Sequence, residues 1–293
     1  MPDQPFPGYR VYDPADPFED HCGPIYYRRD GHGAHCLLPT RPEHANSGGM
    51  LHGGLLLSFA DYALATAGGA LDGKFALTVS LTASFLAAGK IGPPLEGQAE
   101  LVRSGKTLAF ARATVLQEGV ALLAATGVFR LIERGKAMHK SGSLGQAPPA
   151  RQAPPPGFRL VERASPFLKH VGDSYWGERD GKRVIVQATA AHMRNSGGML
   201  HGGVLMNFAD NALSTEIVAA SGGMAPITTS FAAEFLSAGR DGPLLETSVE
   251  LLRMTRSVAF VRGTVSQGDE DLLNYSAVVM LKDRGRLKGA QGG

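Results

Sequence analysis

One block of sequence occurs twice in this chain. Asn46-Ser-Gly-Gly-Met-Leu-His-Gly-Gly-Leu-Leu-Leu-Ser-Phe-Ala-Asp61 recurs as Asn195-Ser-Gly-Gly-Met-Leu-His-Gly-Gly-Val-Leu-Met-Asn-Phe-Ala-Asp210, with 13 of 16 positions identical. The offset between the copies is constant across the block (195 − 46 = 149 and 210 − 61 = 149). This repetition indicates that the same domain is present twice. Any chemistry that one copy carries should therefore recur in the other.

The length of the chain agrees with two domains. Its 293 residues are enough for two units of ordinary size, each with its own core. Between the copies the composition changes to a stretch rich in Pro, Gly and Ser that has too little apolar content to pack. The sequence predicts a first repeat at 17–135, a linker at 136–158 and a second repeat at 159–285.

Charge and cysteine content limit the class of protein. Lys and Arg number 29 against 27 for Asp and Glu, and no run of basic residues would follow a phosphate backbone, so nucleic acid is not an expected partner. No signal peptide or membrane-spanning run is found, which predicts a soluble cytoplasmic protein. Cys22 and Cys36 both lie in the first repeat, whereas the second has none, so we expect two free packed thiols and neither a disulfide framework nor a metal clip.

Periodicity predicts one apolar helix and several strands in each repeat. Leu77-Thr-Val-Ser-Leu-Thr-Ala-Ser-Phe85 alternates, which predicts a half-buried strand with Leu77, Val79, Leu81, Ala83 and Phe85 on its inner face. Three strands at 96–103, 107–117 and 121–133 should follow as an antiparallel meander. Residues 53–67 are apolar on nearly every side, so their helix should be covered all round. The sequence predicts an α+β fold in which an antiparallel sheet wraps one central helix in each repeat.

A carboxylate in the middle of this helix calls for an explanation. Asp61, and Asp210 in the copy, stand among apolar residues where an ionised side chain is costly unless it is paired or hydrogen-bonded. Taken alone, each is as consistent with a hydrogen-bonded structural residue as with a catalytic one.

The residues just before the helix could bind an oxyanion. His52-Gly53-Gly54 stands where unsatisfied backbone N–H groups and the positive end of the helix dipole gather. Glycine lets a substrate carbonyl approach the backbone closely, so the amides of Gly53 and Gly202 are candidate oxyanion donors. A plain turn and helix cap would have the same sequence.

Distance along the helix indicates where such a site could form. Gly53 and Asp61 are eight residues apart, which is about 12 Å of helical rise, so Asp61 cannot serve the start of its own helix. If the two helices pack antiparallel, Asp61 comes near Gly202 and Asp210 comes near Gly53. Two composite sites would then lie between the repeats.

The combined pattern resembles the signature of the PaaI-like hotdog-fold acyl-CoA thioesterases, here in tandem form. The resemblance rests on Asn-x-x-Gly-x-x-His-Gly-Gly with Asp eight residues after the first of the paired glycines, on Leu77-Thr-Val-Ser-Leu81 and on the turn Arg103-Ser-Gly-Lys-Thr-Leu-Ala-Phe110, and it covers roughly 17–133 and 166–283. It implies two hotdog domains, each a long central helix wrapped by an antiparallel β-sheet, packed as an intramolecular pseudo-dimer.

The resemblance also implies roles for individual residues. Asp61 and Asp210 match the carboxylate that activates water or attacks the thioester, and Gly53 and Gly202 match the amide that polarises its carbonyl. Asn46 and Asn195 match an amide that orients water or carbonyl, His52 and His201 match a histidine that braces the loop, and Thr78 and Thr228 match a hydroxyl near the reacting centre. Arg103, Lys106, Arg253 and Arg256 are candidates for binding the phosphates of CoA, or are solvated charges at strand ends.

The leading hypothesis is hydrolysis of an acyl-CoA thioester to free acid and CoA, without a metal or redox cofactor. The alternative is a protein that binds or senses acyl-CoA or an acyl carrier without turnover. A hydratase is disfavoured, because the downstream His that such relatives use is absent. The acyl group stays open, both aryl and fatty, and a homodimer of the double-hotdog chain is plausible.

Overall fold

The computed structural model describes residues 6–11, 16–31, 33–69, 74–133, 153–162 and 165–283. The predicted linker lies mostly outside them, and only its last residues are described. The first repeat contains β1 (Arg10–Val11), α1 (Pro17–Cys22), β2 (Tyr26–Asp30), β3 (Gly33–Leu38), η1 (Pro42–His44), α2 (Gly53–Ala67), β4 (Lys74–Phe85), β5 (Leu95–Ser104), β6 (Leu108–Gln117) and β7 (Val120–Glu133). The second contains β8 (Arg159–Leu160), α4 (Pro166–Val171), β9 (Ser174–Arg179), β10 (Lys182–Gln187), η2 (Ala191–Met193), α5 (Gly202–Ala220), β11 (Ala225–Phe235), β12 (Leu245–Met254), β13 (Val258–Gln267) and β14 (Glu270–Lys282).

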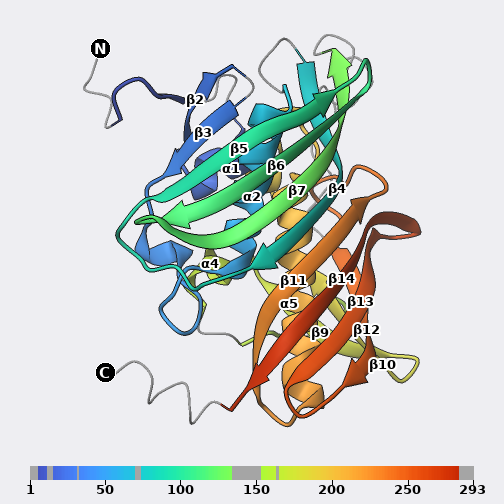
Figure 1. Cartoon of the computed structure of the whole chain (residues 1–293). Helices are drawn as coiled ribbons and strands as arrows, with labels where there is room; N and C mark the ends of the chain where they lie inside the picture. The colour runs from blue at the N-terminus through green and yellow to red at the C-terminus, as the bar shows by residue number, and fades with distance from the viewer. Residues whose placement is uncertain are drawn as a thin grey trace.

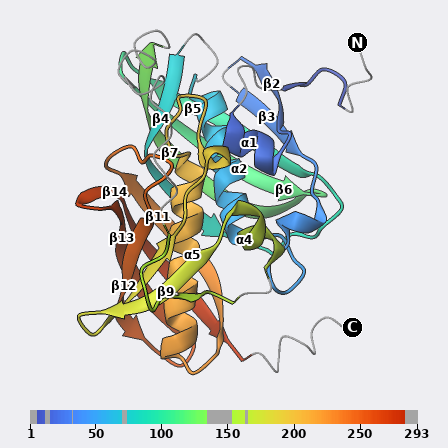
Figure 2. The ribbon, with the colours of Figure 1, turned by 180° about the vertical axis from the view of Figure 1, so that it is seen from behind.

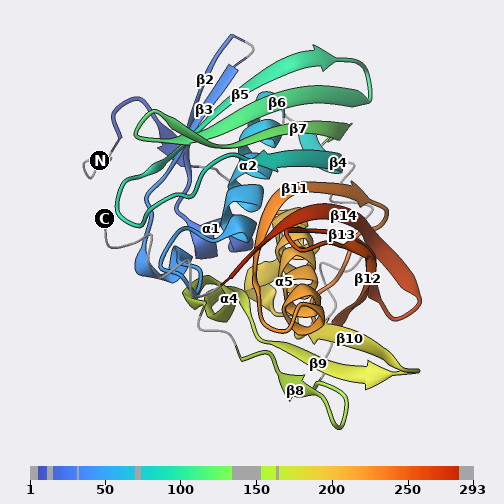
Figure 3. The ribbon, with the colours of Figure 1, turned by 60° about the horizontal axis from the view of Figure 1, so that its bottom comes forward.

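All strands belong to one continuous antiparallel sheet (Figure 1). Its order is β1-β2-β3-β5-β6-β7-β4-β11-β14-β13-β12-β10-β9-β8, so the second repeat mirrors the first about the β4–β11 junction. There Ala83 pairs with Phe231 and Ala232 pairs with Thr82. Figure 3 shows the two halves of the sheet, each curving around its own helix, with β4 and β11 side by side. The predicted α+β architecture of two helix-and-sheet repeats is confirmed.

Helix α2 forms the centre of the first repeat. It is apolar on nearly all sides because it packs against the inner face of β3–β7 and against α5. Leu57, Phe59 and Leu64 are fully enclosed, and burial of each such side chain stabilises the fold by roughly 1.5–3 kcal/mol. Figure 2 shows α2 and α5 from behind the sheet, with the short helices α1 and α4 beside them. The predicted helix bounds are confirmed.

The inner face of β4 differs from its prediction. Leu81 and Ala83 point into the core, but Leu77 and Val79 are exposed on the outer surface. A β-bulge between Thr78 and Ser80 inserts one extra residue against β7, which reverses the side-chain alternation before it. The prediction that Leu77 and Val79 share the inner face is therefore wrong, because a regular period of two cannot show a bulge.

None of the helices in the described part of the chain has the length and apolar character of a membrane span.

Candidate active site

The two central helices cross in antiparallel register at their N-terminal halves. An ideal Cβ placed on Gly202 would lie 3.3 Å from Asp61 Oδ2, and one placed on Gly53 would lie 3.5 Å from Asp210 Oδ2. The helices approach so closely that a Cβ on Gly54 would overlap the side chain of Asn207. Each helix start therefore lies beside the carboxylate of the other repeat, the arrangement that the helical rise requires.

Each helix start is capped by its histidine. The Nδ1 atom of His52 accepts the N–H of Gly54 at 2.9 Å, and Nδ1 of His201 accepts the N–H of Gly203 at 2.9 Å. In the described residues, the N–H of Gly202 has no hydrogen-bond acceptor, as expected of the first residue of a helix. The N–H of Gly202 is thus available at the positive end of the α5 dipole.

A threonine hydroxyl holds each carboxylate. Thr78 Oγ1 donates to Asp61 Oδ1 at 2.8 Å, and Thr228 Oγ1 donates to Asp210 Oδ1 at 2.8 Å. In both repeats this threonine immediately precedes a β-bulge, which turns its side chain inward toward the helix. Because the hydroxyl occupies Oδ1, the other oxygen, Oδ2, is the one that lies near the glycine of the other repeat.

The two asparagines shape the loops before the helices. Asn46 Oδ1 accepts the N–H groups of Gly48 and Met50, and Asn195 Oδ1 accepts those of Gly197 and Met199. These bonds form Asx-type turns. The side-chain oxygens are thus engaged with the backbone, and Asn46 Nδ2 also donates to the carbonyl oxygen of Leu51 at 3.5 Å.

Two aromatic rings that sequence reasoning did not single out line the helix starts. Phe85, the last residue of β4, lies 3.4 Å from a Cβ placed on Gly53. Phe235, the last residue of β11, lies 3.0 Å from one placed on Gly202. Phe85 was assigned to an inner strand face, but its contact with Gly53 depends on the path of the loop before the helix, which no local pattern reports.

The site that contains Asp61 has an acidic cluster. Burial raises the pKa of Asp61 above its usual range, while the charge of His201 and the hydrogen bond from Thr78 oppose that rise. Glu19, on α1, lies with Oε1 3.3 Å from His201 Nε2. Burial raises the pKa of Glu19 to about 7, even though its bond to His201 lowers it.

The histidine in this cluster is subject to opposing effects. Burial disfavours the imidazolium of His201, but the charges of Asp16, Glu19 and Asp61 outweigh burial and raise its pKa to about 9. The helix cap acts against protonation, because Nδ1 can accept the Gly203 N–H only while it carries no proton. With Nδ1 so engaged, the proton of a neutral His201 lies on Nε2 and is donated to Glu19.

The side-chain atoms of Asp16, Glu19 and His201 lie within 4.8 Å of one another, a spacing that a cation could bridge. However, Asp16 Oδ1 already accepts the N–H groups of Phe18 and Glu19, and Oδ2 accepts that of Ser196 at 2.7 Å. These bonds cap α1 and tie it to the loop of the second repeat. Because both oxygens of Asp16 accept backbone N–H groups, this cluster resembles a structural helix cap more than a metal site.

The Asp210 site lacks this acidic pair. At the offset of 149, Leu168 on α4 stands where α1 has Glu19. The aromatic neighbours are kept, since Phe167 packs on His52 as Phe18 packs on His201, both with ring centroids 5.1 Å apart. The repeats therefore form two sites of the same plan but of different polarity. Sequence reasoning missed this difference, although comparison of 19 with 168 could have raised it.

The cationic candidates lie on the surface. Arg103 and Lys106 are exposed at the turn between β5 and β6, and Arg253 and Arg256 are exposed at the matching turn between β12 and β13. Their role with CoA phosphates stays a prediction. Cys22 and Cys36 are buried free thiols, as predicted.

Both repeats match thioesterase families. Residues 40–130 match the family described as the acyl-CoA thioesterase N-terminal domain, and residues 197–274 match the thioesterase superfamily. A protein of Pseudomonas aeruginosa that is named "Putative esterase" is 34% identical over 128 residues, which are 42% of this chain and 95% of that protein.

Solved structures share the whole architecture. A hot dog fold protein of Alicyclobacillus acidocaldarius superposes with a TM-score of 0.64 at 18% identity, over 91% of this chain and 98% of that one. A tesB protein of Mycobacterium avium subsp. paratuberculosis does so with a TM-score of 0.61 at 16% identity, over 88% and 96%. Two thioesterase domains, a relative that is covered almost end to end and a shared double-hotdog fold show that this chain belongs to the thioesterase superfamily, as a tandem hotdog thioester hydrolase.

Proposed function

We propose that the chain hydrolyses an acyl-CoA thioester to a free acid and CoA at two composite sites between its repeats. The observation that carries this proposal is the approach of each helix carboxylate to the helix start of the other repeat, at 3.3 Å and 3.5 Å from the glycine Cβ positions. A thioester carbonyl placed there would meet a backbone donor on one side and a carboxylate on the other.

The geometry supports a simple sequence of steps. The thioester oxygen accepts the N–H of Gly202, which stabilises the negative charge that develops on it. Asp61, fixed by Thr78, takes a proton from water as the water oxygen attacks the carbonyl carbon. The C–S bond then breaks, and the CoA sulfur receives the proton that Asp61 took from water, which restores the carboxylate. In the direct variant, Asp61 attacks the carbon itself, and water cleaves the resulting anhydride.

Burial supports the carboxylate in this role. Because burial raises the pKa of Asp61, its ionised form is a stronger base than an exposed aspartate. Asp210, Gly53 and Thr228 would act in the same way at the second site. We propose that the exposed cations at the two strand turns, described above, attract the CoA phosphates.

Free-thiol release from a panel of acyl-CoAs tests this function. Wild type is compared with Asp61→Asn, Asp210→Asn and the double variant, with Asp271→Asn, an exposed carboxylate on β14, as the matched control. We expect each single variant to lose one site and the double variant to be inactive. If no acyl-CoA is cleaved by wild type while acyl-CoA still binds, the chain is an acyl-CoA-binding protein instead.

Oxygen labelling tests the nucleophilic form of the mechanism in which water attacks the aspartyl carbon of the anhydride. A single turnover in H2¹⁸O puts the label into the released acid when Asp61 acts as base. Label in the aspartate side chain would instead show that it attacks as a nucleophile.

A further inference from the structure

The loops that precede the two central helices share one sequence but have different surroundings. Residues 46–50 and 195–199 both read Asn-Ser-Gly-Gly-Met, and in each loop the asparagine Oδ1 accepts two backbone N–H groups. The asparagine N–H also donates to the carbonyl oxygen of the methionine at 2.7 Å in both loops. Residues 47–49 are nevertheless exposed, whereas residues 196–198 are half-buried. The difference therefore comes from the groups that pack on each loop.

An aromatic ring of the first repeat covers loop 195–199. Phe75, near the start of β4, has its Cζ 3.6 Å from a Cβ placed on Gly197, and the same Cβ would lie 3.2 Å from Asn195 Oδ1. Three residues farther along β4, Thr78 holds Asp61. The ring thus connects the strand that holds the carboxylate with the loop that carries Asn195, across the boundary between the repeats.

The second repeat has a small residue at the matching position. Phe75 pairs with Ile132 where β4 meets β7, and Ala225 pairs with Lys282 where β11 meets β14, both at an offset of 150. Ala225 therefore takes the place of Phe75 at the Asp210 site. A methyl group cannot span the distance that a phenyl ring spans, which agrees with the exposure of residues 47–49.

A carboxylate makes a second contact with loop 195–199. Asp16, the N-cap residue of α1, accepts the N–H of Ser196 with Oδ2 at 2.7 Å. At the offset of 149 the second repeat has Ser165, which caps α4 and whose Oγ donates to the carbonyl oxygen of Ala45 at 3.3 Å. A hydrogen bond to a charged acceptor is stronger than one between neutral groups. The short helix of the first repeat therefore holds its loop more firmly than the short helix of the second.

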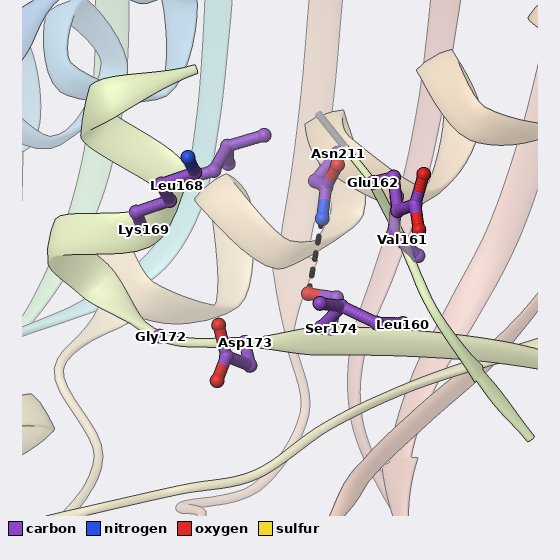
Figure 4. A pocket seen from close by; sticks show the side chains of 9 residues that line it. All are labelled: Leu160, Val161, Glu162, Leu168, Lys169, Gly172, Asp173, Ser174 and Asn211. Carbon is purple, nitrogen blue, oxygen red and sulfur yellow. Dashed lines mark hydrogen bonds between the residues drawn. The ribbon is translucent and has the colours of Figure 1, made fainter. Parts of the chain in front are cut away.

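The short helix of the second repeat also has space beside it. A pocket of about 430 Å³ borders α4, and Figure 4 shows Leu168 and Lys169 of this helix on one side and Asn211 of α5 on the other. At the offset of 149 the first repeat has the larger Tyr62 in place of Asn211, and Tyr62 is 5% exposed. Residues that line a cavity lose packing contacts on that side. Helix α4 is therefore the less constrained of the two short helices.

Building on the proposed thioesterase function, we propose that Phe75 and Asp16 are positioning residues of the Asp61 site. They hold loop 195–199 in one arrangement, so that Asn195 is in place to orient water or the thioester carbonyl. Loop 46–50 samples several arrangements. Only a fraction of the complexes at the Asp210 site then has its asparagine in place, which lowers kcat there. The two sites of one chain thus differ in how far they are ordered in advance.

Hydrogen exchange tests the order of the loops without reference to activity. Residues 47–50 and 196–199 have the same sequence and the same preceding residue, so their intrinsic exchange rates are equal and any difference comes from the structure. We expect loop 46–50 of the wild type to exchange at least tenfold faster than loop 195–199, as the loss of one hydrogen bond to a charged group implies.

Three variants identify the groups that hold the loop. Phe75→Ala should raise the exchange rate of loop 195–199 toward that of the other loop. Asp16→Ser should do the same, although serine can still cap α1 as Ser165 caps α4. Phe110→Ala, which removes an exposed ring from β6, is the matched control and should change neither rate.

Kinetics test the consequence for catalysis. In Asp210→Asn protein, where only the Asp61 site is left, Phe75→Ala should lower kcat at least fivefold and change KM less than twofold, because an interaction made only in the transition state is lost. Phe75→Leu, which keeps part of the apolar cover, should recover most of kcat. In Asp61→Asn protein, Ala225→Phe should raise kcat of the Asp210 site and slow the exchange of loop 46–50, a gain that misfolding cannot mimic.

Two results would overturn the proposal. One is equal exchange of the two loops in the wild type, and the other is faster exchange in Phe75→Ala protein without a change in kcat. Failure of the proposed function gives a different result. A wild type that releases no thiol from any acyl-CoA of the panel would contradict the thioesterase function, while the exchange rates would still decide whether the loops differ.

Discussion

Replacement of Glu19 by leucine should change the protonation of His201 and, with it, the pH dependence of the Asp61 site. Leucine is the residue that the second repeat has at the same position, as Leu168, so the variant has a native precedent in this fold. It removes the carboxylate that lies 3.3 Å from His201 Nε2.

Two competing effects determine how far the pKa of His201 should change. The rise in the pKa of His201 from 6.5 to about 9 corresponds to about 3 kcal/mol in favour of the imidazolium. The helix cap that protonation of Nδ1 would break is worth about 1 kcal/mol, so the acidic neighbours prevail in the wild type. A hydrogen bond to a charged group contributes about 1.5–3 kcal/mol. Loss of Glu19 should therefore lower the pKa of His201 by about one to two pH units, which brings its titration close to neutral pH.

The assay is a titration of the ring ¹⁵N shifts of labelled protein, which report protonation and tautomer together. In Asp210→Asn protein, where only the Asp61 site is left, the alkaline limb of kcat/KM should move to lower pH when Glu19→Leu is added. The matched control is Leu168→Glu in Asp61→Asn protein, which should install such a limb at the other site. An unchanged His201 titration in folded Glu19→Leu protein would refute the reasoning.

The pH dependence of stability, one glycine and the two cysteines can each be tested separately. On folding, the pKa of Glu19 rises from 4.5 to about 7 and that of His201 rises from 6.5 to about 9. The folded state therefore binds more protons than the unfolded state, and Tm should fall as pH rises from 5 to 9. A Tm that rises over this range would contradict this prediction. Gly202→Ala would place a Cβ 3.0 Å from Phe235 and 3.3 Å from Asp61, and should lower kcat/KM of the Asp61 site at least tenfold, more than Gly53→Ala lowers that of the other site. Burial raises the pKa of Cys22 to about 12 and raises that of Cys36 further, so a disulfide reagent should label neither thiol until denaturant is added, and rapid labelling of native protein would disprove this.

Local periodicity and repeat spacing predicted the elements that they encode directly. The helix at 53–67 has the bounds that its apolar pattern indicated, and the antiparallel meander follows it as expected. Helical rise excluded a site within one helix, and the sequence predicted the pairing of Asp61 with Gly202 on the condition that the two helices pack antiparallel.

Contacts between distant residues had no such signal. Glu19 and His201 are separated by 182 positions, and neither residue type indicates its partner. The bulge after Thr78 depends on the register against β7, so it appears only when the strands are paired. The junction of β4 with β11, which makes one sheet of two, likewise arises from packing of the repeats and from no motif in either strand.

Covalent duplication has a consequence for how these sites can differ. In a symmetric homodimer a residue occurs at the same place in both sites, so one substitution changes both. Here each site takes its carboxylate from one repeat and its helix start from the other, and each position can vary alone. Glu19 against Leu168 and Tyr62 against Asn211 are such differences, whereas the Asp, Thr, His and Gly residues of the two sites are identical in both repeats. The first of these changes alters the charge next to the capping histidine His201. In a tandem chain the surroundings of the two sites can therefore diverge while the residues that the two repeats share stay unchanged.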